Sequence, residues 1–389
     1  MPHSPGSSRN GNKRVRHIRG DIAERLTQFS FFRGRVALSA ILRALGVGRG
    51  DEVILQAFTC VAVPEGIMSV GAKPVYVDVA PDSPNMDAQD LQRKITPRTR
   101  AVIVQHSYGL PADMSQLLPV TRQHGLPVIE DCAHTVMSRI AGELVGSFGD
   151  AAFYSYEAAK PVFVGIGGSA IANSESLGAH IAREYALFEE PSMMAQLENE
   201  AMLHAYHVAY RPSTYWAVRS VFRALSKAGV IRGNYNKVDI AVGPASDFSR
   251  RMGSMQVRRL RQELKQLGRQ TDHRLRVAEQ YRSRISGETV RHFAVAPGVE
   301  PVFGRYPMIA KDKRDLVERA RDARVELAVF YDTPVQPLTG DALRTVGYEP
   351  GSCPEAEHRA QHVVSLPTGY QVTPRVIDRT VKFFNERIA

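Results

Sequence analysis

The chain has few cysteines and no long apolar run. Its 389 residues include three cysteines, Cys60, Cys132 and Cys353, which are far apart and form no CxxC or zinc-binding spacing. This argues against a disulfide framework and favours a reducing compartment, so we expect a cytoplasmic protein. No stretch approaches about 20 apolar residues, and the N-terminus has no apolar signal core, so we expect neither a membrane span nor secretion.

The composition is that of a globular protein without low-complexity tracts. Apolar residues make up 43% and charged residues 23% of the chain, and the net charge is +10. Lys and Arg are mixed with Asp and Glu along the whole length, and the dense basic cluster at residues 13–19 is short. We therefore expect no nucleic-acid partner, because a solvated arm or a general attraction for phosphorylated substrates explains the excess as well.

Short apolar runs alternate with stretches of helical length. Val- and Ile-rich runs at residues 52–55, 73–79, 101–106, 127–131, 151–156 and 167–172 read as strands. Leu38, Ile41, Leu42 and Leu45 follow helical spacing, and Gly46 ends that helix. Strands alternating with helices predict a mostly parallel α/β sheet that is covered on both faces.

The length predicts a large domain followed by a smaller one. We expect an N-terminal arm at residues 1–30, a sheet domain at 31–240 and a smaller C-terminal α+β domain at 241–389. Residues 174–232 read as mainly helical. Residues 255–267 form an amphipathic helix, with Val257, Leu260, Leu264 and Leu267 on one face.

Asp131 closes the apolar run PVIED. In an open parallel sheet, ligands bind beyond the carboxyl ends of the strands, and a carboxylate buried there is costly unless it meets a cation. The protonated nitrogen of a pyridinium ring is such a cation. The alternative is that Asp131 caps a helix beginning at DCAH.

Further groups lie where they can share a cavity with Asp131. His134 follows three residues later, and Lys160 is reached through YSYEAAK after the next apolar run. Most lysines are surface charges, but an amine at a strand end can be neutralised and form a Schiff base. A phosphate would find the Ser155 hydroxyl and the backbone N–H groups where a helix begins after Gly34.

Five segments occur in an order typical of one protein family. They are GRVALSAILRALGVGRGDEVILQAFTCVAVPEGI, GAKPVYVDV, ITPRTRAVIVQHSYGLPADM, HGLPVIEDCAHT and GSFGDAAFYSYEAAKP. With them the chain resembles the DegT/DnrJ/EryC1/StrS family of sugar aminotransferases that depend on pyridoxal phosphate (PLP). The resemblance covers about residues 31–385 and implies PLP fold type I, with a mostly parallel seven-stranded sheet flanked by helices and a smaller C-terminal α+β domain.

The resemblance implies roles for individual residues. Lys160 matches the Schiff-base lysine, Asp131 the acid at the pyridine nitrogen, and His134 a residue near the phenolic oxygen. The positions that match the phosphate cup are Gly34, Arg35 and Ser155, and Tyr331 matches a tyrosine near the substrate pocket. Arg251 falls in a loop that reaches the neighbouring subunit's site in the family, which implies a homodimer with shared active sites.

Four positions depart from the family's common pattern. Arg35 stands where Thr is usual beside the phosphate, and Cys60 where an aromatic ring stacks on the cofactor. Ser249 replaces an Asn from the partner subunit that binds the phosphate, and Ile166 replaces a common Glu in the Gly-rich turn. These departures suggest an atypical acceptor and leave Lys160 and Asp131 untouched.

The activity implied is transfer of an amino group from glutamate or glutamine to a keto-sugar, typically nucleotide-linked, or to a keto-cyclitol, with PLP and its aminated form PMP as cofactor. Two alternatives stay open. A PLP-dependent sugar dehydratase typically has His at the position of Lys160, and a non-catalytic PLP-binding regulator is kept open by Cys60 and Ile166.

Two histidine pairs have spacings that can bind zinc on a helix. They are His204 with His207 and His358 with His362. No third ligand accompanies either pair in the sequence, so we expect solvated helix faces and no metal site.

Overall fold

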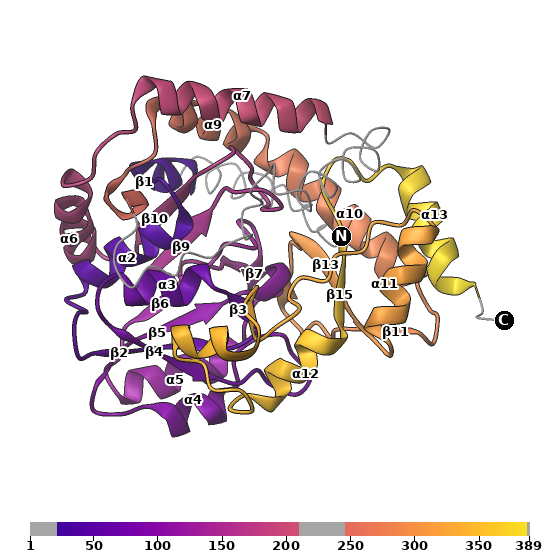
Figure 1. Ribbon diagram of the computed structural model, residues 1–389, viewed down its shortest axis with the longest axis horizontal. Coiled ribbons are helices and arrows are strands. Elements are labelled where there is room, and N and C mark those ends of the chain that lie inside the picture. The colour runs from indigo at the N-terminus through magenta and orange to yellow at the C-terminus, as the bar shows by residue number, and fades with distance from the viewer. Residues whose placement is uncertain (1–21, 210–245, 387–389) are drawn as a thin grey trace, which may run out of the picture.

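A seven-stranded sheet forms the centre of the protein (Figure 1). The computed structural model describes residues 22–209 and 246–386. In spatial order the strands are β1 (Phe29–Phe31), β10 (Gly168–Ala172), β9 (Ala151–Ser155), β6 (Val128–Asp131), β5 (Thr99–Gln105), β2 (Glu52–Gln56) and β4 (Lys73–Val77). The five strands from β9 to β4 are parallel, and β10 and β1 join antiparallel at one edge. The predicted mostly parallel sheet is confirmed.

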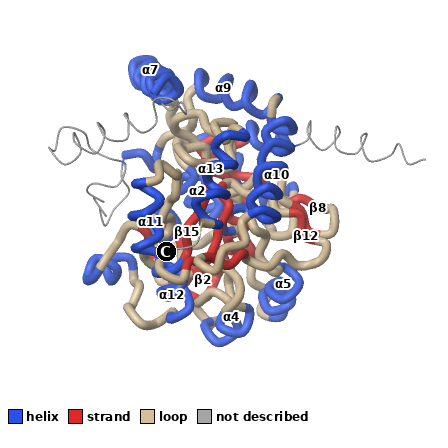
Figure 2. The backbone as a smooth tube through the Cα atoms, turned by 90° about the vertical axis from the view of Figure 1, so that its right-hand side faces the viewer, coloured by secondary structure: helices blue, strands red, loops and turns tan. Residues whose placement is uncertain are grey.

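Helices cover both faces of this sheet. Alternate strand residues point to opposite faces: Val53 and Leu55 belong to one apolar cluster, and Ile54 to another. The first face carries α2 (Gly34–Ala44), α3 (Ala62–Met68) and α6 (Glu175–Ala186), and the second carries α4 (Ala88–Lys94) and α5 (Met114–Gln123). In Figure 2 the strands lie in the middle, with α4 and α5 below and α7 (Met193–Ala209) and α9 (Ser254–Lys265) above.

The C-terminal part forms a second, antiparallel sheet. Its strands are β11 (Val290–His292), β13 (Arg305–Ala310) and β15 (Val363–Pro367). Around it lie α10 (Leu267–Arg284), α11 (Lys313–Asp322), α12 (Pro354–His362) and α13 (Pro374–Asn385), to the right in Figure 1. The expected α+β tail is therefore present, whereas the boundary near residue 240 lies outside the described residues.

Short elements join the two parts of the chain. Strand β3 (Thr59–Cys60) pairs with β14 (Val335–Gln336), so a segment of the large sheet region lies beside the C-terminal part. A small sheet combines β7 (Arg139–Ile140), β8 (Glu143–Leu144) and β12 (Val299–Glu300). None of the helices in the described part of the chain has the length and apolar character that crossing a bilayer requires.

The N-terminus of α2 is pressed against the ends of β9 and β10. A Cβ atom built on Gly168 would lie 2.4 Å from the backbone nitrogen of Gly34, and one built on Gly34 would lie 3.0 Å from the Cβ atom of Ser155. Only glycine fits at Gly168, because the atoms it faces are backbone atoms that no side-chain rotation can move. This contact brings the first N–H groups of α2 next to Ser155.

We predict that Gly168→Ala lowers the free energy of unfolding by about 3 kcal/mol, because overpacking against backbone forces the helix and the sheet apart. The control is Gly178→Ala in α6, where the nearest atom to a new Cβ is a side-chain carbon 3.7 Å away. Alanine favours a helix interior over glycine by about 0.5–1 kcal/mol, so this variant should keep or gain stability. Urea denaturation measures both. Equal effects of the two substitutions would show that the contact is not tight.

Candidate active site

The predicted site residues lie at the carboxyl ends of two neighbouring strands. Strands β6 and β9 are parallel, and Asp131 at the end of β6 is in register with Phe153 of β9. Ser155 is the last residue of β9, and Lys160 follows in a loop whose backbone turns back from Glu157. The structure therefore brings Asp131, Ser155 and Lys160 to one edge of the sheet, as the sequence predicts.

Asp131 is buried at this edge. One of its carboxylate oxygens accepts a hydrogen bond from the N–H of Ala133 at 2.9 Å, and no described residue donates to the other. Burial raises the pKa of Asp131, and the positive charge of Lys160 acts in the opposite direction. Residues 132–138 form turns and no helix, so the helix-cap alternative is wrong. The second oxygen is left for a cationic partner.

His134 is held neutral and in one orientation. Its Nδ1 accepts a hydrogen bond from the N–H of Tyr108 at 3.0 Å, so the ring proton is assigned to Nε2, which lies 3.3 Å from the hydroxyl of Tyr331. Burial, helped by the charge of Lys160, keeps the pKa of His134 well below its usual range. The ring therefore presents an N–H donor on the side of Tyr331.

Aromatic rings from two distant segments line the space beside Lys160. Phe330 and Tyr331 stack with their ring centroids 4.5 Å apart, and the Nζ atom of Lys160 lies 5.9 Å from the centroid of Phe330. The hydroxyl of Tyr108 donates to the carbonyl oxygen of Phe330. Tyr331, predicted near the substrate pocket, is itself buried. Its hydroxyl lies 3.3 Å from Nε2 of His134.

The N-terminus of α2 offers an anion site. The N–H groups of Val36 and Ala37 donate to the carbonyl of Arg33, whereas those of Gly34 and Arg35 have no recorded backbone partner in the described chain. Such groups at a helix N-terminus attract phosphate. The guanidinium of Arg35 forms an ion pair with Glu65 of α3, and that of Arg33 with Glu157 at 2.8 Å. The phosphate contact expected of Arg35 thus stays a prediction, and Glu65 competes with it.

Cys60 ends β3 and is partly exposed. Burial raises the pKa of its thiol, and the charge of Lys160 acts in the opposite direction. The side chain therefore carries a neutral thiol at the position where the family has a stacking ring.

Ser249 and Arg251 lie beside β1, which is an edge strand of the large sheet. Arg251 pairs with Phe31 of β1 and approaches the carboxylate of Glu190 at 3.5 Å. Ser249 is exposed, and its carbonyl accepts the N–H of Glu189. Neither residue lines the cavity next to Lys160 in its own chain. Their expected role in the partner's site stays a prediction.

The sequence did not lead us to predict a second buried acid, which lies behind Asp131. The carboxylate of Glu130 accepts three backbone N–H groups, from Gly146, Phe148 and Gly149, at 2.7 Å each. It also accepts the Nε2–H of His106 at 3.0 Å. The signal was present in PVIED, because neighbouring residues of a strand face opposite sides and one of two adjacent acids must be buried away from the site.

Three buried side chains lie close enough to share a metal ion, namely His106, Glu130 and Cys132. Both ring nitrogens of His106 and both oxygens of Glu130 already have hydrogen-bond partners, so the cluster is a satisfied structural network. His358 and His362 stack at 4.1 Å without a third ligand among the described residues. The side chain of His207 lies outside the described residues.

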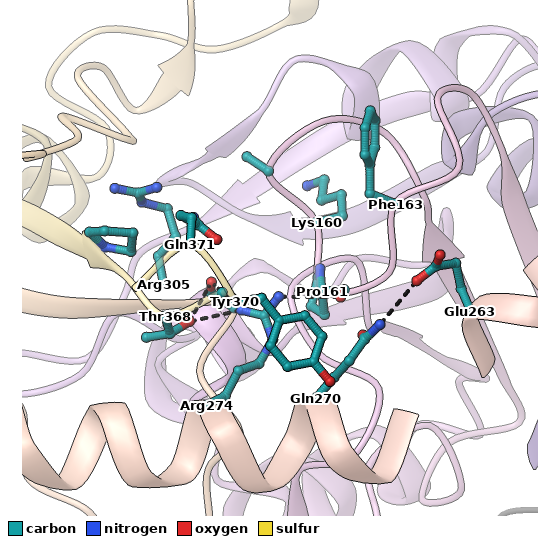
Figure 3. Close-up of a pocket in the computed structure, with 14 residues that line it drawn as sticks. Lys160, Pro161, Phe163, Glu263, Gln270, Arg274, Arg305, Thr368, Tyr370 and Gln371 are labelled. Atoms are coloured by element: carbon teal, nitrogen blue, oxygen red, sulfur yellow. Dashed lines mark hydrogen bonds between the residues drawn. The ribbon is translucent and has the colours of Figure 1, made fainter. Parts of the chain in front are cut away.

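A cavity of about 280 Å³ opens beside Lys160 (Figure 3). Its other walls come from the C-terminal part of the chain and include Gln270 and Arg274 of α10, Arg305 of β13, and residues 367–371. Arg274 donates to the carbonyl of Pro161, the residue after Lys160, at 3.2 Å. No local pattern marks Arg274 as a residue of this cavity, because its helix is more than 100 residues from Lys160 along the chain.

Comparisons with known proteins agree with this geometry. Residues 29–385 match the DegT/DnrJ/EryC1/StrS aminotransferase family. The chain belongs to this family. The resemblance found in the sequence is thereby confirmed, and the protein is an aminotransferase of a PLP-dependent family.

Three similar proteins illustrate the range of the family. The UDP-N-acetyl-3-dehydro-alpha-D-glucosamine 3-aminotransferase of Acidithiobacillus ferrooxidans is 31% identical over 86% of this chain and 77% of its own. A pleiotropic regulatory protein of Geobacillus stearothermophilus is 29% identical over 92% and 82%. The crystal structure of S. venezuelae DesV with a ketimine intermediate is 25% identical, with a TM-score of 0.70 over 96% of this chain and 90% of that one.

We predict that His134→Gln makes the protein less sensitive to acid. The pKa of His134 is lowered by folding, so below about pH 6.5 the unfolded chain binds a proton that the folded chain refuses, and the wild type loses up to about 1.4 kcal/mol per pH unit. Glutamine does not titrate. As the pH falls from 7.5 to 5, the unfolding free energy of the variant should therefore increase relative to that of the wild type. Urea denaturation of the cofactor-free proteins measures this difference. A difference that stays constant over this range would place His134 in a solvated setting.

Proposed function

We propose that this protein transfers an amino group from glutamate or glutamine to a keto-sugar, typically nucleotide-linked, or to a keto-cyclitol, with PLP and PMP carried at Lys160. The observation that carries the proposal is the meeting of Lys160, the half-satisfied carboxylate of Asp131 and the neutral ring of His134 at one strand edge. We place the activity in the cytoplasm, in keeping with three cysteines that form no disulfide framework.

The residues present fit PLP. The unpaired oxygen of buried Asp131 suits a protonated pyridine nitrogen, which would stabilise the carboxylate that burial disfavours. The N–H groups of Gly34 and Arg35 with the hydroxyl of Ser155 suit the phosphate. The Nε2–H of His134 suits the phenolic oxygen, and the neutral thiol of Cys60 would face one side of the ring.

Each residue then has a defined task. The amine of Lys160 binds the cofactor covalently and, once released, moves a proton to and from the α-carbon of the amino donor. Asp131 keeps the pyridine nitrogen protonated, and His134 donates a hydrogen bond that fixes the ring. When bound, the cofactor supplies an electron sink for the negative charge that develops on that carbon. The stacked rings of Phe330 and Tyr331 would form an aromatic wall on one side.

The substrate class rests on the family and on the relative from A. ferrooxidans, whose name assigns it a UDP-linked keto-sugar. Two other functions are weighed against it. A dehydratase disagrees with the intact Lys160. A regulator without turnover has support from the relative named as a regulatory protein. Measuring the conversion of glutamate to its keto acid separates the regulator from the aminotransferase.

We predict that borohydride reduction of the PLP-loaded protein attaches the cofactor to Lys160, because this amine lies at the site edge with Asp131 and His134. Peptide mapping by mass spectrometry locates the adduct. Lys160→Ala should abolish both the adduct and the conversion of glutamate or glutamine to the keto acid. The control Lys382→Ala removes an exposed lysine of α13 and should change neither. An adduct on another lysine contradicts the assignment, and a wild type that binds PLP without converting either donor supports the regulator.

We also propose that the functional unit is a homodimer with shared active sites, built from chains with domains at 31–240 and 241–389. The arm expected at residues 1–30 ends earlier than predicted, because Phe29–Phe31 forms β1 of the large sheet and the side chains of Ile22 and Leu26 are buried. In this dimer Arg251 and Ser249 complete the site of the partner subunit. What supports this is that neither residue lines its own chain's Lys160 cavity, while the ion pair of Arg251 with Glu190 is 36–40% exposed.

Mixing two inactive variants tests the dimer. When Lys160→Ala chains exchange subunits with Arg251→Ala chains, a mixed dimer contains one site with both an intact lysine and an intact arginine. We predict that about a quarter of the wild-type activity returns at equal mixing, since about half the dimers are then mixed and each has one working site. No recovery after subunit exchange, verified by mass spectrometry of the dimers, would mean that each site is self-contained.

A further inference from the structure

The geometry points to the cavity beside Lys160 as the site of the amino donor. We propose that Arg274 binds the donor's carboxylate, and that Glu263 with Gln270 favours a donor whose side chain ends in an amide over one that ends in a second carboxylate. The proposal rests on the proposed function and names the substrate recognition of the same site.

Arg274 brings a positive charge to the cavity that no described carboxylate neutralises. Its guanidinium donates to the carbonyl of Gly304 at 2.9 Å, to the hydroxyl of Thr368 at 2.8 Å and to the carbonyl of Pro161 at 3.2 Å. These partners are neutral. The neighbouring Arg305 differs, because its guanidinium lies 3.1 Å from the carboxylate of Glu326.

An uncompensated cation in such surroundings is unfavourable. Burial, helped by the charge of Arg305, lowers the pKa of Arg274 to about 10. The guanidinium has five N–H donors, of which three have recorded acceptors. A carboxylate that enters the cavity can take the remaining donors and supply the missing negative charge. The three hydrogen bonds to neutral partners meanwhile keep the guanidinium in place for it.

The size of the cavity decides which ligand fits. Its volume of about 280 Å³ lies just below the range of about 300–1,000 Å³ that is typical of small-molecule pockets. That space suits an amino acid, whereas a nucleotide-linked sugar would have to extend beyond it. Lys160 lines the same cavity, so a bound amino acid lies next to the amine that the reaction requires.

Glu263 of α9 and Gln270, one turn before Arg274 on α10, carry the selectivity. Figure 3 shows Glu263 and Gln270 on the right, Arg274 and Thr368 on the left, the ring of Tyr370 between Arg274 and Gln270, and Lys160 above. Gln270 donates from its Nε2 to one carboxylate oxygen of Glu263 at 3.0 Å. A second carboxylate on the donor would be repelled by Glu263, whereas an amide can donate its N–H to the free oxygen of Glu263. Glutamine is therefore preferred to glutamate.

Two analogues without an amino group test binding apart from turnover. Glutarate has two carboxylates, and glutaramate has one carboxylate and one amide. Titrated calorimetrically into the PLP-loaded wild type, glutaramate should bind at least tenfold more tightly than glutarate. Arg274→Lys keeps the charge and loses the bidentate geometry of the guanidinium, so glutaramate should bind at least tenfold more weakly. The control Arg276→Lys, at an exposed position of the same helix, should leave binding unchanged.

Glu263→Gln keeps the shape of the half-buried wall and removes its charge. In this variant the dissociation constants of the two analogues should differ by less than threefold. The rate of conversion of glutamate should rise relative to that of glutamine. This variant does not disturb the hydrogen bonds of Arg274, so it tests the cavity even where Arg274→Lys folds poorly. If Glu263→Gln still prefers glutaramate to glutarate by the wild-type factor, the proposed role of Glu263 in selectivity is wrong.

Single-turnover conversion of glutamine by the wild type separates this proposal from the proposed function. If the wild type converts glutamine while Arg274→Lys alters neither glutaramate binding nor the KM for glutamine, the donor binds elsewhere and the inference is wrong. Conversion without binding of either analogue also overturns it, since the cavity is then covered in the assembled protein. If the wild type converts no amino acid although glutaramate binds through Arg274, the proposed function is the part that fails.

Discussion

The buried carboxylate of Asp131 is the constraint on which the site depends. It lies at the end of a strand that is covered on both faces, and its single hydrogen bond from Ala133 satisfies half of it. A carboxylate in this setting gains from a cation held close by. The strand order places Lys160 on one side, and behind the strand Glu130 is fully occupied by backbone N–H groups and His106. Two adjacent acids thus have separate tasks, one structural and one directed at a ligand.

Most arginines around the site form ion pairs with glutamates. At the helix end, Arg33 and Arg35 each have a glutamate partner, so a phosphate that binds there enters an already balanced group and must compete for the arginines. On the side of the C-terminal part, Arg305 is paired with Glu326. Arg274 stands out because its partners are carbonyl and hydroxyl oxygens. The described chain supplies its geometry and leaves its charge to a ligand.

The aromatic wall shows how the two parts of the chain cooperate. Tyr108 comes from the loop after β5, and Phe330 and Tyr331 from the segment before β14. Together they enclose His134, and burial lowers the pKa of the imidazole, so that its Nδ1 stays an acceptor for the N–H of Tyr108 at neutral pH. A shift of the C-terminal part relative to the sheet would open this wall, so the position of that part affects the protonation of a residue in the large domain.

The sequence by itself determined the sheet and the residues at its strand ends. Short Val- and Ile-rich runs, together with the glycines that end helices, are local signals, and they predict Asp131, Ser155 and Lys160 at one edge of the sheet. Only the tertiary structure showed that Glu65 holds Arg35, that Tyr331 contacts His134, and that Arg274 lines the cavity of Lys160. These contacts join residues that are 30, 197 and more than 100 positions apart, respectively. Their existence depends on how helices and loops pack, and no pattern within one segment of the sequence records it.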